Sequence, residues 1–207
     1  IAVGFALAVV LPRAGNIGGG GFMVIYDEDS NDAYAIDYRE KAPAASLRDM
    51  YLDENGEFDI LKSTFGYSAI GVPGTVHGFW SVHQRFGSLP WADLIQPSIM
   101  LAERGFVMSD YMAETLSNYF EKMSYYDETQ NIFLKNYPKL KDSRLIQNDL
   151  AKTLKRIQKN GLKGFYSGET AQLIAADMKE NGGLITEQDL LEYRSIWREP
   201  IKGTYRG

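Results

Sequence analysis

The chain has 207 residues, of which 44% are hydrophobic and 24% are charged, and its formal net charge is −5. These values are typical of a globular protein with a substantial core, and the lack of a basic excess argues against nucleic acid or an anionic membrane as a partner. There is no cysteine and there are two histidines. This excludes disulfides, thiolate metal sites and a cysteine nucleophile, and it makes a three-histidine metal site hard to build.

The chain opens with an uninterrupted apolar run over residues 1–11. The run is too short to span a membrane, which takes about 20 residues, and it lacks the basic start and small-residue cleavage site of a signal peptide. We therefore expect the later part of a buried helix that ends near Pro12. Neither end of the chain carries a terminating feature, so we expect residues 1–207 to be a single domain, truncated at both ends from a longer polypeptide.

Two segments after this helix have the pattern of paired strands. Residues 22–26 form an apolar run with β-branched and aromatic members, which predicts a strand buried on both faces. A polar turn separates this run from residues 33–38, so the two segments predict a hairpin. Alternation along the second strand predicts one small and charged face and one large apolar face. The first face carries Ala33, Ala35, Asp37 and Arg39, and the second carries Tyr34, Ile36 and Tyr38.

The remaining sequence predicts mainly helices, so the fold class is α+β, a strand pair followed by mostly helices. Residues 42–70 look irregular with a turn at 53–56, and Val72-Pro73-Gly74 predicts a type II turn. Apolar residues then recur at helical spacing over 76–86, 91–103, 112–123, 150–160 and 171–180. Ser109 and the segment 186–189 have the patterns of helix caps, whereas residues 124–148 are hard to assign.

Residues 18–21 are four consecutive glycines, a composition shared with phosphate-binding loops. A P-loop or a dinucleotide-binding loop follows a strand and opens a helix, whereas this run precedes a predicted strand and contains no lysine. We therefore expect the glycines to allow another backbone segment to approach closely, where any side chain would collide.

Few residues are candidates for chemistry. His77 and His83 are six residues apart, which places them on different faces of a helix, so we expect both to be structural or surface residues and predict no metal site. Arg39 is a better candidate, because it follows a predicted strand and its guanidinium can bind a carboxylate through two parallel hydrogen bonds. The alternative for Arg39 is a surface ion pair with Asp37 or Glu40.

The segments Pro12–Met23 and Ile36–Pro43 resemble the γ-glutamyltranspeptidase family, and the first of them is highly specific. Further matches follow in the same order over 71–74, 89–91 with Pro97, 102–106, 164–168, 182–186, 189–190, Pro200 and 203–207. The resemblance extends over nearly the whole chain and is weakest over about residues 107–148. It implies an N-terminal-nucleophile hydrolase with a four-layer αββα sandwich, of which this chain is part of the large subunit.

In such proteins a precursor cleaves itself, and the new N-terminal threonine of the small subunit attacks the γ-glutamyl amide with its own amine as the base. The γ-glutamyl group, usually from glutathione, then passes to water, an amino acid or a peptide. The resemblance therefore implies that the partner is the small subunit of the same precursor and that the catalytic nucleophile is not in this chain. It implies no cofactor and a periplasmic or secreted location. From the residues themselves we predict no metal site and no membrane span in this segment.

Two residues match substrate-binding positions of the family. Arg39 matches the arginine that holds the α-carboxylate of the glutamyl donor, and Glu40 matches the adjacent acid. Two alternatives stay open. One is a related acylase acting on cephalosporins or processing poly-γ-glutamate, which would share the fold and mechanism. The other is an inactive homologue that only binds.

Overall fold

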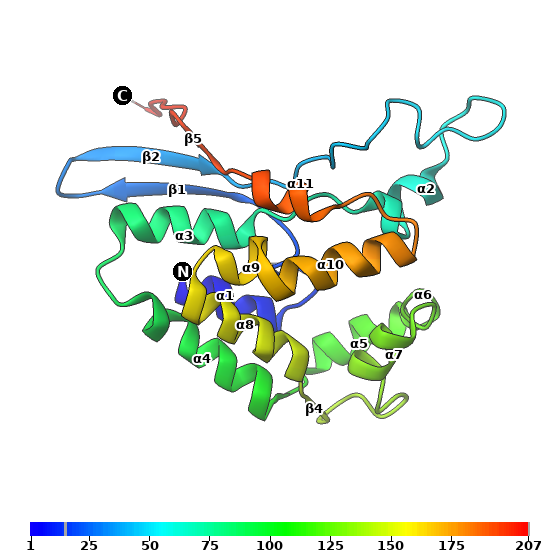
Figure 1. The fold of residues 1–207 in the computed structure, drawn as a ribbon. Coiled ribbons are helices and arrows are strands. Elements are labelled where there is room, and N and C mark those ends of the chain that lie inside the picture. The colour runs from blue at the N-terminus through cyan, green and yellow to red at the C-terminus, as the bar shows by residue number, and fades with distance from the viewer. Residues whose placement is uncertain (15, 207) are drawn as a thin grey trace.

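A three-stranded antiparallel sheet lies over a layer of helices in the computed structural model, which describes residues 1–14 and 16–206 (Figure 1). Strand β1 (Phe22–Asp27) pairs with β2 (Asp32–Asp37), and β2 pairs with β5 (Ile196–Arg198). The predicted hairpin and the α+β class are therefore confirmed. Gly15 and Gly207, which fall in segments that match the family, lie outside the described residues.

The two faces of the sheet differ in exposure. Ile36 is 1% exposed and belongs to the main hydrophobic core. On the opposite face of the hairpin, Phe22, Val24 and Tyr26 are 64%, 70% and 64% exposed. The prediction that residues 22–26 are buried on both faces is therefore wrong for this chain, because helices cover only one side of the strand (Figure 1).

The helices have the following bounds. In chain order they are α1 (Ala2–Val10), α2 (Ile60–Thr64), the 3-10 turn η1 (Tyr67–Ala69), α3 (Thr75–Phe86), α4 (Trp91–Arg104), α5 (Asp110–Asn118), α6 (Phe120–Met123), α7 (Asp127–Phe133), α8 (Asn148–Asn160), α9 (Lys163–Tyr166), α10 (Gly168–Glu180) and α11 (Glu187–Glu192). Between them, β3 (Phe106–Val107) pairs with β4 (Arg144–Leu145).

The predicted helices are present, with differences in two regions. Residues 42–70, expected to be irregular, contain α2 and η1. The helix expected over 112–123 is divided at Tyr119 into α5 and α6. Both predicted caps are confirmed, since Ser109 accepts from the Met112 amide and Thr186 forms a capping box with Asp189.

The main core is built around α1. Phe5 is 0% exposed, and its ring meets the rings of Phe79 and Trp91 edge to face at centroid distances of 5.2 and 5.5 Å. Burying a ring of this size stabilises the fold by roughly 2 kcal/mol relative to leaving it in water. Val3, also on α1, is 71% exposed, so this helix is only partly buried. No helix within the described residues combines the length and the apolar character needed to cross a membrane.

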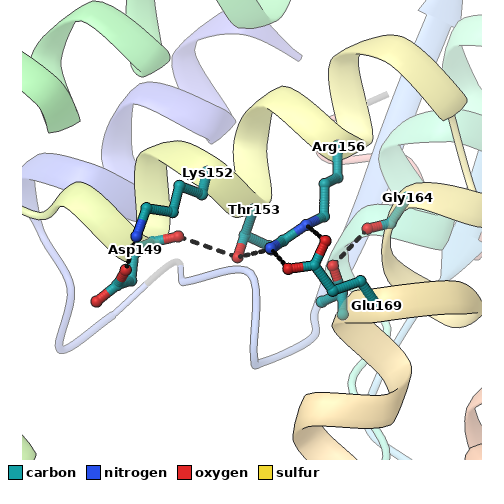
Figure 2. A network of polar contacts seen from close by, with 7 residues as sticks. Asp149, Lys152, Thr153, Arg156, Gly164 and Glu169 are labelled. Atoms are coloured by element: carbon teal, nitrogen blue, oxygen red, sulfur yellow. Dashed lines mark hydrogen bonds and ion pairs between the residues drawn. The ribbon is translucent and has the colours of Figure 1, made fainter.

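An ion pair joins α8 to α10 at the edge of this core (Figure 2). Arg156 donates from Nε to Glu169 Oε2 at 2.9 Å, and a terminal guanidinium nitrogen contacts the other carboxylate oxygen. Thr170, next in the chain, donates to the Gly164 carbonyl at 2.7 Å. Because a bidentate pair restrains orientation as well as distance, these contacts fix the start of α10, from which the chain runs to α11 and β5.

A second, smaller hydrophobic cluster lies in the part of the chain that sequence patterns do not resolve. It is formed by Met108, Ala113, Leu116, Leu134, Leu140 and Leu145. Ala113 and Leu116 lie on α5, Leu134 directly follows α7, and Leu145 lies on β4. We call residues 108–143, between β3 and β4, the peripheral lobe. The chain enters and leaves this lobe through the paired strands β3 and β4, and Phe106 packs against both hydrophobic clusters.

Candidate functional site

The glycine loop at residues 18–21 packs against the chain that leaves β2. A Cβ atom on Gly20 would lie 2.4 Å from the Tyr38 carbonyl oxygen and 2.8 Å from the Glu40 nitrogen. Gly21 and Tyr38 exchange two backbone hydrogen bonds, of 3.2 and 2.9 Å. The expected close approach of two backbones is therefore confirmed, and the segment it fixes is the one that carries Arg39.

The same loop also meets the first turn of α3. The Gly19 carbonyl oxygen accepts from the amides of Gly74 and Thr75, at 2.8 and 3.0 Å. Gly74 has φ −116° and ψ −17°, so the predicted type II turn is wrong, because that turn needs a positive φ at its glycine. Gly74 instead precedes the helix, with its amide directed at the glycine loop.

Arg39 lies on the surface at the end of the hairpin. Its side chain is 62% exposed, and its Nε atom is 3.4 Å from Glu40 Oε2. The ion pair with Glu40 that the sequence left open is therefore present. Asp37, the other candidate, is engaged by Arg198, whose Nε and terminal nitrogen donate to Asp37 Oδ2 at 2.9 and 2.7 Å.

Asp37 also fixes the backbone of the site. Its Oδ1 atom accepts from the Arg39 amide at 3.0 Å. This hydrogen bond, assisted by the adjacent Arg198 and opposed by desolvation, holds the pKa of Asp37 below its usual range. The carboxylate is therefore charged at neutral pH, and its hydrogen bond to the Arg39 amide fixes the backbone directly after β2.

Glu40 carries a buried oxygen that lacks a donor. Its Oε2 atom has no hydrogen-bond partner within the described residues, because the 3.4 Å approach of Arg39 is an ion-pair contact without hydrogen-bond geometry. Burying an unpaired acceptor costs about 1–3 kcal/mol, and more when it is charged. A guanidinium and a carboxylate therefore lie side by side directly after β2.

The two histidines lie in structural positions. His77 on α3 is 9% exposed, and its Nδ1 atom lies 2.8 Å from Ser195 Oγ and accepts from the Ser195 amide at 3.3 Å. Burial, reinforced by the charge of Arg194, lowers its pKa to about 4. His83 Nε2 is 2.8 Å from the Leu89 carbonyl oxygen. No group of three potential metal ligands gathers within the described part of the chain.

Two cavities flank the peripheral lobe. One, of about 700 Å³, lies between residues 11–14 and helices α5 to α7, and another, of about 630 Å³, lies between the lobe and the start of α8. Neither is lined by Arg39 or Glu40. The exposed Arg39 side chain therefore lies at the surface, outside both of these cavities.

Comparison with known proteins identifies the family. The sequence profile described as gamma-glutamyltranspeptidase matches residues 1–207. The glutathione hydrolase proenzyme of Escherichia coli K12 is 45% identical over 209 residues, which cover 100% of this chain and 36% of that protein. The chain therefore spans about a third of the length of this relative.

Solved structures agree. The γ-glutamyltranspeptidase of Helicobacter pylori superposes with a TM-score of 0.96 at 46% identity, over 100% of this chain and 59% of that one. The transpeptidase CapD of Bacillus anthracis gives a TM-score of 0.79 at 36% identity, over 100% of this chain and 62% of that one. With the profile matched from end to end, this chain belongs to the γ-glutamyltranspeptidase family.

Proposed function

We propose that the chain is the large-subunit portion of an enzyme that cleaves the γ-glutamyl amide of glutathione and related compounds. The γ-glutamyl group would pass to water, an amino acid or a peptide. The family match over residues 1–207 supports this proposal, as does the activity named for the relatives from Escherichia coli and Helicobacter pylori. The observation that carries it is the exposed guanidinium of Arg39, held on a fixed backbone beside Glu40.

The proposal assigns each of these two residues a binding role. Arg39 binds the α-carboxylate of the γ-glutamyl donor, because a guanidinium matches a carboxylate with two parallel hydrogen bonds. Glu40, whose side chain is 31% exposed, accepts from the donor's ammonium group or from a group on the partner. Neither residue breaks the amide bond, and the threonine nucleophile is assigned to the small subunit.

The partner in this proposal is the small subunit of the same precursor. The matched relative is a proenzyme of which this chain covers 36%. The open face of the hairpin carries Phe22, Val24 and Tyr26, and apolar strand residues of this kind pack against a second sheet in layered folds. We assign this face to contact with the rest of the precursor, and we place the enzyme in the periplasm or outside the cell.

Substitution of Arg39 in the full-length protein tests the proposal. Arg39→Ala should raise KM for γ-glutamyl-p-nitroanilide at least about thirtyfold, because a lost charged pair costs roughly 2 kcal/mol or more. Arg39→Lys should also raise KM, since an ammonium cannot reproduce the guanidinium fork. Arg48→Ala is the matched control, because the Arg48 side chain is 96% exposed and its contact with Asp49 is 3.8 Å. An unchanged KM in Arg39→Ala would contradict the proposal.

The likeness to CapD, which is named a transpeptidase and a capsule biosynthesis protein, is compatible with a second candidate on the same scaffold, the poly-γ-glutamate-processing enzyme that the sequence left open. Both candidates use a γ-glutamyl donor, so Arg39 does not discriminate between them. Steady-state rates of the full-length protein on glutathione and on poly-γ-glutamate do. Faster turnover of glutathione is expected, and activity confined to the polymer would favour the second candidate.

A further inference from the structure

The backbone of Arg39 is held by a tyrosine from a distant part of the sequence. The Tyr193 hydroxyl donates to the Arg39 carbonyl oxygen at 2.8 Å, across 154 residues of chain. Tyr193 directly follows α11 and is 3% exposed. Burial raises the pKa of Tyr193, so its hydroxyl keeps the proton that it donates.

The ring of Tyr193 is fixed by three neighbours. It stacks on the ring of Tyr166, with centroids 5.7 Å apart and planes 9° from parallel, and it meets the His77 ring edge to face at 5.6 Å. Lys41 Nζ lies 5.2 Å from the ring centroid and donates to the Arg194 carbonyl at 2.9 Å. A ring held on these sides cannot move its hydroxyl away from Arg39 without breaking contacts of about 0.5–1.5 kcal/mol each.

The surroundings of the hydroxyl are crowded as well. A Cβ atom on Gly74 would lie 2.1 Å from the Tyr193 hydroxyl oxygen and 2.0 Å from the Tyr38 carbonyl oxygen. On the other side, a Cβ atom on Gly20 would lie 2.9 Å from the Arg39 carbonyl carbon. The Arg39 peptide is therefore confined between the glycine loop and Tyr193, and its amide is bound to Asp37.

We propose that Tyr193 is a positioning residue for substrate binding, which aims the Arg39 guanidinium by fixing the Arg39 carbonyl. The inference rests on the proposed function, in which Arg39 binds the donor carboxylate. Without the hydroxyl, the Arg39 peptide loses one of its two tethers and the side chain explores more directions. Binding of the donor must then order it again, so the donor binds more weakly while the chemistry on the small subunit is unaffected.

Tyr193→Phe in the full-length protein tests this role, because it removes the hydroxyl and keeps the stacked ring. KM for γ-glutamyl-p-nitroanilide should rise about three- to tenfold, the equivalent of one hydrogen bond, while kcat stays within about twofold. KM for the acceptor glycylglycine should not change. Tyr51→Phe is the matched control, since it also removes one hydroxyl that donates to a backbone carbonyl, that of Ser68 at 3.1 Å, and its KM should equal that of the unmodified protein.

A double variant separates positioning from general structural damage. In the Arg39→Ala background, Tyr193→Phe should cause no further rise in KM, because its effect passes through Arg39. Equal rises in both backgrounds would overturn the positioning role, and so would a fall in kcat at unchanged KM. If Arg39→Ala itself leaves KM unchanged, the proposed function fails. If Arg39→Ala raises KM and Tyr193→Phe does not, only the role of Tyr193 fails.

A second variant keeps the test open if Tyr193→Phe does not fold. Replacing Tyr193 by 4-fluorophenylalanine removes the hydrogen-bond donor, keeps an atom in the place of the hydroxyl oxygen and preserves the ring packing. Its KM for the donor should lie above that of the unmodified protein. A KM equal to that of the unmodified protein, at equal kcat, would overturn the proposal.

Discussion

At the scale of single residues, the geometry around Arg39 depends on glycines that lie against its backbone. Arg39 is exposed, yet its backbone is held by contacts that only glycines permit, at Gly20 and Gly74. The neighbours at both positions are backbone atoms or a locked ring, which have little freedom to move aside. The position of the Arg39 backbone therefore depends on Gly20 and Gly74 as well as on Arg39 itself.

Gly74→Ala should destabilise the protein by about 3 kcal/mol, because the added Cβ would lie 2.0 Å from the Tyr38 carbonyl oxygen. The measurement is urea unfolding of the full-length protein. Gly203→Ala is the control, since nothing lies within 4 Å of the added atom and no positive φ opposes it. Equal stability of the two variants would show that the contact around Gly74 is looser than described.

The sequence identifies Arg39 as a candidate binding residue but gives no sign of a role for Tyr193. A guanidinium after a strand, inside a family-specific motif, stands out in one short segment. Tyr193 is one of 13 tyrosines, and its partner lies 154 residues away, so no local pattern marks it. The same applies to Arg198, whose pairing with Asp37 depends on β5 returning beside β2.

At the scale of elements, α3 is tied to the segment before β5 through His77. Its Nδ1 atom accepts from the Ser195 amide, so this nitrogen must be unprotonated in the folded state. Burial, with Arg194 as a second cause, lowers the His77 pKa from 6.5 to about 4. Between about pH 4 and 6.5, His77 is therefore mainly neutral in the folded protein and mainly protonated in the unfolded chain.

The stability of the protein should consequently fall as the pH drops from about 6.5 towards 4, by about 3 kcal/mol in total from this one group. Above about pH 6.5 the contribution is complete, because His77 is neutral in both states. Free energies of unfolding in urea across this range provide the measurement. His77→Asn keeps an acceptor near Nδ1 but does not titrate, so its profile should be flatter. Parallel profiles would exclude His77 as the source.

The elements themselves were partly predictable. Amphipathic periodicity located α3, α4, α8 and α10, and cap residues located the starts of α5 and α11, because these signals are local. The burial of β1 was mispredicted, because an apolar run does not report whether other parts of this chain cover both faces of the strand. Helix α7, which lies between residues 124 and 148, has only 7 residues and lacks a periodic stripe long enough to detect.

At the scale of the whole molecule, the open face of the sheet leaves apolar side chains of β1 exposed on this chain. Val24→Asp in the full-length protein should lower Tm clearly, because the new charge would be buried under the part of the precursor that we assign to this face. Leu173→Asp is the control, at a residue 57% exposed on α10, and should cost much less. A smaller loss for Val24→Asp than for Leu173→Asp would remove this face from the interface.

The short ribbon of β3 and β4 brings the two ends of the peripheral lobe side by side, with Phe106 opposite Leu145. A segment whose two ends lie side by side can be lengthened, shortened or replaced without moving the elements that precede and follow it. We therefore expect substitutions, insertions and deletions to destabilise the protein less in the peripheral lobe than around the glycine loop. This geometry offers a structural reason for the weak family resemblance of about residues 107–148.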